Sequence, residues 1–165
     1  MRWIRFVVLL LVFTLLQAGL VQRLAVGASN ITPDLILVVL VFIAIFGKTR
    51  QAIIASFAAG FAADLVGHMM GVYTLSYGIL GTALAYLHKV IAIRKMPWQA
   101  VTIFLFGFIS GTLAYWLNLL RTQSPVDNIY QTICFSSIYS GLIGPFLFLI
   151  CAWWMRIKTN RFHRD

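Results

Sequence analysis

Six apolar stretches separated by short polar segments limit the fold of this chain more than any other feature of its sequence. A helix that crosses a membrane needs about 20 predominantly apolar residues, with about 17 at the low end. The second and third stretches are short for this purpose, and local thinning of the bilayer would accommodate them. The last is long and contains Gly144 and Pro145, a pair that is expected to bend a helix. The predicted spans are residues 6–21, 31–46, 52–67, 72–87, 100–120 and 129–155.

The amino-acid composition also indicates a membrane protein. Of the 165 residues, 61% are hydrophobic and 10% are charged, whereas a soluble domain is about 45–50% apolar and about 25% charged. A water-soluble core of this size could not hide so much apolar surface. We therefore predict an all-α, polytopic membrane protein in which six transmembrane helices form a single integral membrane domain over residues 1–165.

The distribution of basic residues predicts the orientation. If the N-terminus is cytoplasmic, eleven Lys and Arg residues fall on the cytoplasmic side, and only Arg23 and Arg121 fall on the other. Such an excess follows the positive-inside rule, so both termini are expected in the cytoplasm. The same rule accounts for the net charge of +9 without a nucleic-acid partner.

The first apolar stretch allows two interpretations. Arg2, Arg5, the apolar run and the small residues at 26–28 resemble a secretory signal peptide with its cleavage site. We predict instead that the segment is retained as a membrane helix. Cleavage would leave five spans with the same orientation.

Asp64 is the most unusual residue of the predicted spans, because an ionisable group at membrane depth is costly and should face protein or water. Helical spacing places Gly60 and His68 on its face of the third span. One interpretation is a proton or ligand site. The other is a structural role, in which the carboxylate forms hydrogen bonds that fix a loop or a helix end near the outer membrane surface.

Asp34 has a simpler explanation at the start of the second span. Thr32 suits the N-cap of a helix, Pro33 suits its first position, and Asp34 suits the positive end of the helix dipole.

The inventory of reactive residues argues against an enzyme. Asp34 and Asp64 both lie toward the outer face and could form an acid–base pair, but neither is part of the Asn-x-x-Asp pattern of a lipoprotein signal peptidase. The chain has no Glu, and His68, His88 and His163 are scattered, so we expect no metal set and no cofactor. The two cysteines lie too far apart on one helix to form a disulfide with each other.

Small residues at helical spacing are abundant and favour close helix contacts, either within the chain or with a partner helix. The predicted contact strips are Ala55, Ala59 and Ala63; Gly78 and Gly81; Gly107 and Gly111; and Ser137, Gly141 and Pro145.

The order of motifs in the middle of the chain resembles the MreD family of rod shape-determining proteins. Pro33 and Asp34 open the second span, a Gly-x-x-x-Asp-Leu sequence runs from Gly60 through Asp64, and Gly71 precedes the fourth span. The resemblance is best over residues 31–90. Elsewhere it rests on length, hydropathy and the basic C-terminal tail.

This resemblance implies a multi-pass protein of the bacterial inner membrane that acts as a scaffold in lateral peptidoglycan synthesis. It also implies contact with MreC, which has a single membrane helix, and through it with RodA and penicillin-binding protein 2, with MreB on the cytoplasmic side. We expect MreC to bind by helix-in-groove docking, with Pro33, Asp34, Gly60, Asp64 and Gly71 as its partner-binding or structural polar site.

The resemblance also implies a helical architecture shared with the S-components of energy-coupling-factor transporters, which gives an alternative function. A small-molecule binder of that kind would place Asp34, Asp64, Tyr73 and Tyr77 around an outward-facing polar cavity.

Overall fold

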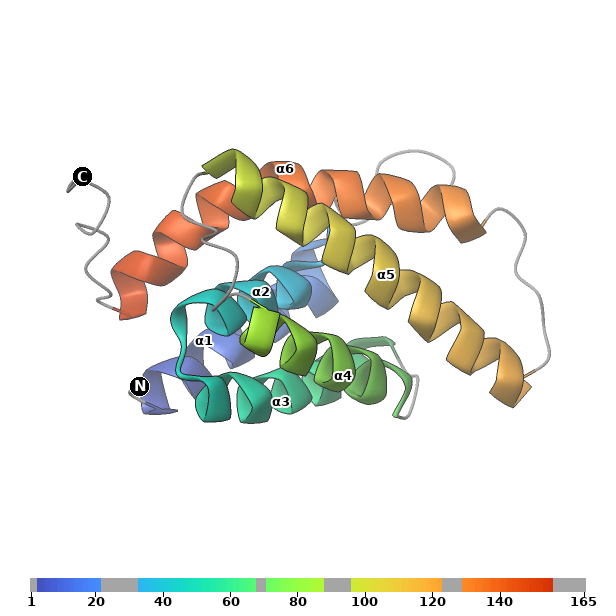
Figure 1. Ribbon diagram of the computed structural model, residues 1–165, viewed down its shortest axis with the longest axis horizontal. Helices are drawn as coiled ribbons and strands as arrows, with labels where there is room; N and C mark the ends of the chain where they lie inside the picture. The colour runs from blue at the N-terminus through green and yellow to red at the C-terminus, as the bar shows by residue number, and fades with distance from the viewer. Residues whose placement is uncertain (1–2, 22–32, 68–70, 88–95, 123–128, 156–165) are drawn as a thin grey trace.

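The computed structural model describes residues 3–21, 33–67, 71–87, 96–122 and 129–155, and within these ranges it contains helices and no strand (Figure 1). Consecutive helices run in alternating directions, so α1 begins and α6 ends on the same side of the molecule (Figure 1). The elements are α1 (Trp3–Leu16), the π-helical turn η1 (Gln17–Val21), α2 (Leu35–Phe46), α3 (Thr49–Gly67), α4 (Val72–Leu87), α5 (Met96–Thr122) and α6 (Ile129–Met155).

Helix α2 forms the centre of the core. It contacts all five other α-helices, and its residues from Leu35 through Ala44 are all buried. Its sequence is apolar on every side, which is the pattern of a helix surrounded by other helices. From α1, Phe6, Leu9 and Phe13 pack into the same core.

Helices α3 and α4 form a close hairpin through small residues. A Cβ atom added at Gly60 would lie 2.6 Å from Thr74 Cα and 2.7 Å from Tyr73 O, so no side chain fits between the two backbones there. Gly81 of α4 similarly leaves room for Ser56 of α3. Ala55, Ala59 and Ala63 of α3 are also buried. The small-residue strips that the sequence predicts on these two helices are therefore used within the chain.

Helices α5 and α6 pair in the same way. Gly107 faces Ser137, and Gly111 faces Ile133, each at a separation that leaves little or no room for a Cβ atom. Pro145 lies inside α6, and the helix changes direction toward its C-terminal part (Figure 1). The bend predicted from the Gly-Pro pair agrees with this course.

The helical architecture confirms the all-α part of the predicted fold class, whereas the polytopic topology with six membrane spans stays a prediction. In the described ranges, two helical segments are long and apolar enough to cross a membrane, Trp98–Arg121 and Ile129–Met155. Three further apolar segments, Trp3–Gly19, Leu35–Phe46 and Val72–Leu87, are shorter.

The helix bounds differ from the predicted ones in α1, α2, α3 and α5. Helix α1 begins at Trp3 and is followed by a π-helical turn, and α5 ends at Thr122. Helix α2 begins at Leu35 with Asp34 as its N-cap, so the prediction that Thr32 caps this helix was wrong. Aspartate is as good an N-cap as threonine, and Pro33 then lies outside the helix. Helices α3 and α5 begin at Thr49 and Met96, before their apolar stretches, because a helix can continue into the polar region next to a membrane.

Some predictions concern residues outside the described ranges. These are the cleavage site at 26–28, Arg23, His68, the basic segment at 88–95 that includes His88, and the C-terminal tail at 156–165 that includes His163. Cys134 and Cys151 are both free thiols.

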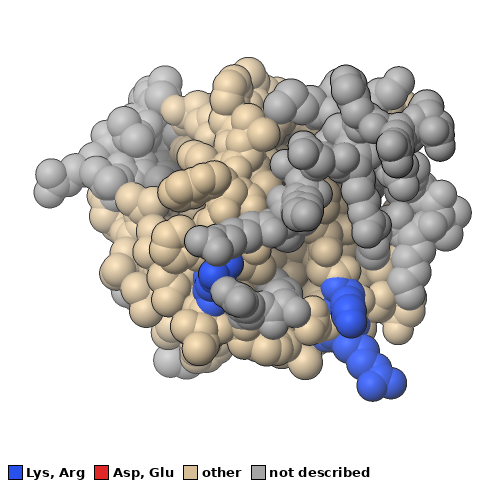
Figure 2. All heavy atoms as spheres, turned by 90° about the vertical axis from the view of Figure 1, so that its left-hand side faces the viewer, with Lys and Arg blue, Asp and Glu red and all other residues tan. Residues whose placement is uncertain are grey.

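The end of the molecule at which α1 begins and α6 finishes carries positive charge. Figure 2 shows Lys and Arg side chains on this face, and no Asp or Glu among the residues drawn in colour there. Lys48 and Arg50 lie exposed at the turn between α2 and α3. The predicted orientation would place this face in the cytoplasm, and the orientation stays a prediction.

Candidate functional site

The Asp64 carboxylate caps the N-terminus of the neighbouring helix. Asp64 lies on α3 with 7% of its surface exposed. Its Oδ1 accepts a hydrogen bond from the Tyr73 amide at 2.8 Å, and its Oδ2 accepts from the amides of Gly71 at 3.0 Å and Thr74 at 2.9 Å. The Thr74 hydroxyl also donates to Oδ2. The first amides of a helix have no partner within that helix, and one carboxylate here satisfies three of those around the start of α4.

Two glycines make this cap possible. Gly71 has a φ of +87°, a backbone conformation that favours glycine. Gly60 lies one helical turn before Asp64 and lets the first turn of α4 approach α3. The Gly-x-x-x-Asp sequence and Gly71 therefore serve one local structure, which fixes the α3–α4 hairpin.

Asp34 connects three helices at the start of α2. Its Oδ1 accepts from the Leu37 amide at 3.0 Å, which makes it the N-cap of α2. Its Oδ2 accepts from the hydroxyl of Tyr77 on α4. Its own amide donates to Ser140 Oγ on α6 at 2.7 Å. Asp34 thus joins α2, α4 and α6 through side-chain hydrogen bonds.

Gln17 of η1 completes this arrangement. Its side-chain amide donates to the Pro33 carbonyl at 3.2 Å and accepts from the Leu35 amide at 2.8 Å. Sequence reasoning missed both Gln17 and Ser140. Gln17 is a polar residue at the end of an apolar run, which was the available signal, whereas nothing in the sequence pairs Ser140 with Asp34. We call Gln17, Asp34, Tyr77 and Ser140 the polar junction.

The polar junction lies next to the Asp64 cap. The rings of Tyr73 and Tyr77 meet edge to face with centroids 5.6 Å apart, and the Tyr73 amide is one of the donors to Asp64. The structure therefore brings Asp34, Asp64, Tyr73 and Tyr77 together, as the small-molecule alternative requires. Within the described residues, every buried side-chain nitrogen and oxygen atom has a hydrogen-bond partner. These hydrogen bonds cross-link the helices.

The described residues also contain no group of three His, Cys, Asp or Glu side chains placed to hold a metal ion. Both carboxylates act as helix caps, so their hydrogen bonds are used for structure.

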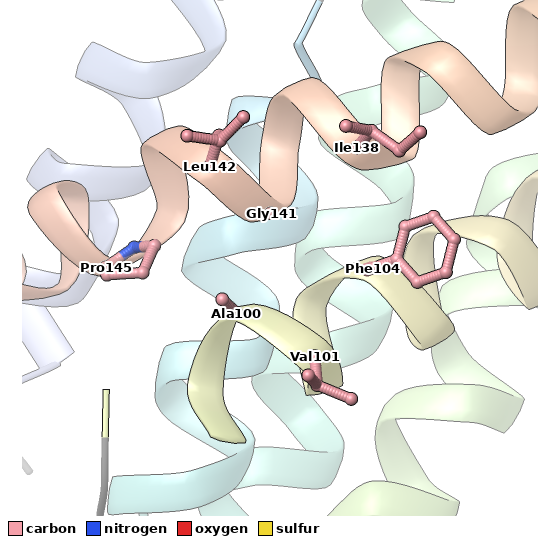
Figure 3. Close-up of a pocket in the computed structure, with 7 residues that line it drawn as sticks. All are labelled: Ala100, Val101, Phe104, Ile138, Gly141, Leu142 and Pro145. Atoms are coloured by element: carbon pink, nitrogen blue, oxygen red, sulfur yellow. The ribbon is translucent and has the colours of Figure 1, made fainter. Parts of the chain in front are cut away.

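A separate apolar groove lies between α5 and α6. It has a volume of about 550 Å³. Figure 3 shows side chains of both helices along it, with the Gly141 backbone between Leu142 and Ile138. At its floor the two helices approach closely, because a Cβ atom added at Gly141 would lie 3.2 Å from the Ala100 carbonyl oxygen. The lining residues are Ala100, Val101, Phe104, Ile138, Gly141, Leu142 and Pro145.

Comparison with known proteins identifies the family. The family model described as rod shape-determining protein MreD matches residues 1–155, which include all the helices described above. No curated protein and no solved structure is a significant match. The motif order, the glycines and the aspartate that build the α3–α4 hairpin, and a family match over most of its length lead to one conclusion: the chain belongs to the MreD family of rod shape-determining proteins.

Proposed function

We propose that this protein is a scaffold of the bacterial cell-wall elongation machinery that binds an MreC-like protein within the inner membrane. Membership of the MreD family connects the chain with rod shape determination and with the membrane. RodA and penicillin-binding protein 2 would be reached through the MreC-like partner, and MreB indirectly from the cytoplasmic side. The scaffold would act by contact, without a chemical step.

The observation that carries this proposal is how the described polar groups are used. The aspartates cap helices, and the buried polar side chains in the described ranges are bonded within the protein. The exposed surface of the helices is instead rich in large apolar side chains, among them Leu142 and Phe146 on α6. Such a molecule offers surfaces for helix contact rather than groups for chemistry.

The α5–α6 groove is the surface on which we place the membrane helix of the MreC-like partner. Its two walls belong to the helices that are long and apolar enough to cross a membrane. Helices associate in lipid by close packing at small residues, because lipid tails are as apolar as the side chains themselves. Gly141 and Ala100 provide such small residues at the floor of the groove.

Gly60 and Asp64 would support partner binding indirectly, by holding the α3–α4 hairpin together. They lie in the α3–α4 contact, so their replacement would disturb partner binding by disturbing the hairpin. Pro33, Asp34 and Gly71 belong to the same outer end of the fold.

A pair of matched variants tests the docking surface. Leu142→Trp would fill the groove, whereas Phe146→Trp places the same side chain at an exposed position of α6 outside it. We expect Leu142→Trp to reduce co-purification of an MreC-like partner and to impair rod shape, with unchanged thermal stability. Phe146→Trp should change neither. Equal partner recovery with both variants would place the docking surface elsewhere.

A second test concerns the hairpin. Gly60→Leu and Asp64→Leu should lower thermal stability and partner recovery together. Full partner binding and normal cell shape in both variants would refute a role for this region.

The alternative of a small-molecule binder is favoured by the juxtaposition of Asp34, Asp64, Tyr73 and Tyr77. A thermal-shift screen with vitamin-sized ligands separates the two functions. The scaffold predicts no stabilisation, whereas a saturating ligand would raise the unfolding temperature and favour the transporter class.

A further inference from the structure

Helix α6 is divided at Pro145 into two parts with different attachments. On the C-terminal side, the ring of Phe148 packs on Phe42 of α2 with centroids 5.4 Å apart. Trp154 Nε1 donates to the Arg5 carbonyl of α1 at 3.2 Å, and Cys151 is fully buried between these two contacts. This part of α6 is fixed to the core.

The proline itself is a compliant point. Residue 145 has no amide hydrogen, so the carbonyl of Gly141 loses the intrahelical hydrogen bond that it would otherwise receive from four residues later. Helices bend most readily at such positions. Gly144 lies in close contact with Ile103 of α5, which keeps the bend point itself in place.

On the N-terminal side of Pro145, Ser140 ties α6 to the polar junction. Ser140 is 1% exposed and accepts the Asp34 amide at 2.7 Å. The rest of the polar junction is held by several further hydrogen bonds. Asp34 also bonds Leu37 and Tyr77, and Gln17 bonds the residues on either side of Asp34, Pro33 and Leu35. Release of the single bond to Ser140 would leave the rest of the junction intact.

We propose that α6 is hinged at Pro145 and that the bond between the Asp34 amide and Ser140 is the catch that sets the position of its N-terminal part. Ile138, Gly141 and Leu142 of the groove lie on that part, next to Ser140 in the helix. This part of α6 also packs on α5 at Gly107 and Gly111. Release of the catch would let it shift along that contact and so change the width of the α5–α6 groove. Control of partner binding by this device rests on the proposed function, whereas the hinge and the catch do not.

Amide hydrogen exchange of the full chain in lipid nanodiscs, without any partner, tests the device. Ser140→Ala should raise exchange in residues 129–143 by about fivefold, the effect of losing one hydrogen bond, and leave residues 146–155 unchanged. Ser137→Ala is the matched control, because Ser137 is also a buried serine of α6 but its hydroxyl bonds the Ile133 carbonyl within the same helix. Ser137→Ala should change the exchange rate less than twofold, because the backbone hydrogen bonds of α6 do not depend on the Ser137 hydroxyl.

The hinge is tested by Pro145→Ala combined with Ser140→Ala. A continuous helix fixed at its C-terminal part should reduce the rise in residues 129–143 to less than about twofold. If Ser140→Ala does not fold, Ser140→Cys keeps a weak acceptor and should give a smaller rise over the same residues. Equal rises on both sides of Pro145, no difference from Ser137→Ala, or no effect of Pro145→Ala would each overturn the proposal. None of these readouts involves the partner, so the hinge can fail while the scaffold function stands, and the reverse.

Discussion

Replacement of Asp64 gives the sharpest test of how this fold is held together. The carboxylate accepts three backbone amides and one hydroxyl from the start of α4, and Asp64 is 7% exposed. Hydrogen bonds to a charged acceptor contribute about 1.5–3 kcal/mol each. The contributions of neighbouring bonds to the unfolding free energy are not additive. In the variant, water can also bond some of the amides at the start of α4, which reduces the loss. We therefore expect Asp64→Ala to cost about 4 kcal/mol of unfolding free energy.

Asp64→Asn separates the geometry of the cap from its charge. The amide oxygen can replace only one carboxylate oxygen, so the side-chain nitrogen would face an amide donor of Tyr73 or those of Gly71 and Thr74. We expect a loss of about 2 kcal/mol for Asn. For a chain of this size, 1 kcal/mol corresponds to about 2–4 °C in Tm. Asn should then lower Tm by about 4–8 °C and Ala by about 8–16 °C.

The assay is thermal unfolding of the purified protein in detergent, followed by tryptophan fluorescence, beside complementation of cell shape. Loss of cell shape should track loss of stability across wild type, Asn and Ala. If Asn and Ala both kept the wild-type Tm but abolished function, Asp64 would be a proton or ligand site and the capping argument would be refuted.

Three further substitutions test other contacts by the same assay. Gly60→Ala should lower stability by about 2 kcal/mol, because its Cβ would meet the Thr74 and Tyr73 backbone, whereas Gly67→Ala meets only the edge of the Tyr73 ring at 3.4 Å and should be nearly neutral; equal effects would contradict the close approach. Tyr77→Phe removes the hydroxyl bond to the Asp34 carboxylate while keeping the ring, and should cost about 1.5–3 kcal/mol; a silent variant would show that the junction contributes nothing to stability. Leu40→Ala, in the middle of α2, should cost about 2 kcal/mol from the cavity it leaves, against less than about 0.5 kcal/mol for Leu149→Ala on the exposed side of α6; similar values would argue that α2 is not enclosed.

Sequence reasoning reached the helical architecture because the apolar runs are long and their interruptions are charged or contain glycine. It also singled out Asp64, since a carboxylate among alanines and glycines stands out in any apolar segment. It could not say what Asp64 binds, because the donors are backbone amides, and every residue except proline has one.

The polar junction is a second case in which the sequence does not reveal the hydrogen-bond partner of a residue. Asp34 and Ser140 are 106 residues apart, and their bond joins a backbone amide to one of several serines in α6. Small-residue strips predicted helix contacts but not whether the contacts lie within the chain or with a partner. The structure places those of α3 and α4, and Gly107 and Gly111 of α5, in contacts within the chain. The candidate docking surface is therefore the groove beside the α5–α6 contact.

Because α2 is surrounded by the other helices, its length and sequence are restricted by protein packing rather than by contact with lipid. A helix in contact with lipid must match the thickness of the hydrocarbon layer, but a helix surrounded by protein needs only to fit the space that its neighbours leave. The 12 residues of α2 rise about 18 Å, which is well short of a hydrocarbon layer of about 30 Å. In the predicted six-span topology, Asp34 would cap the first turn of α2 beneath the membrane surface, where its carboxylate is bonded to Leu37 and Tyr77. In such a molecule, short length marks the innermost helix, and volume rather than hydropathy should restrict which residues α2 accepts.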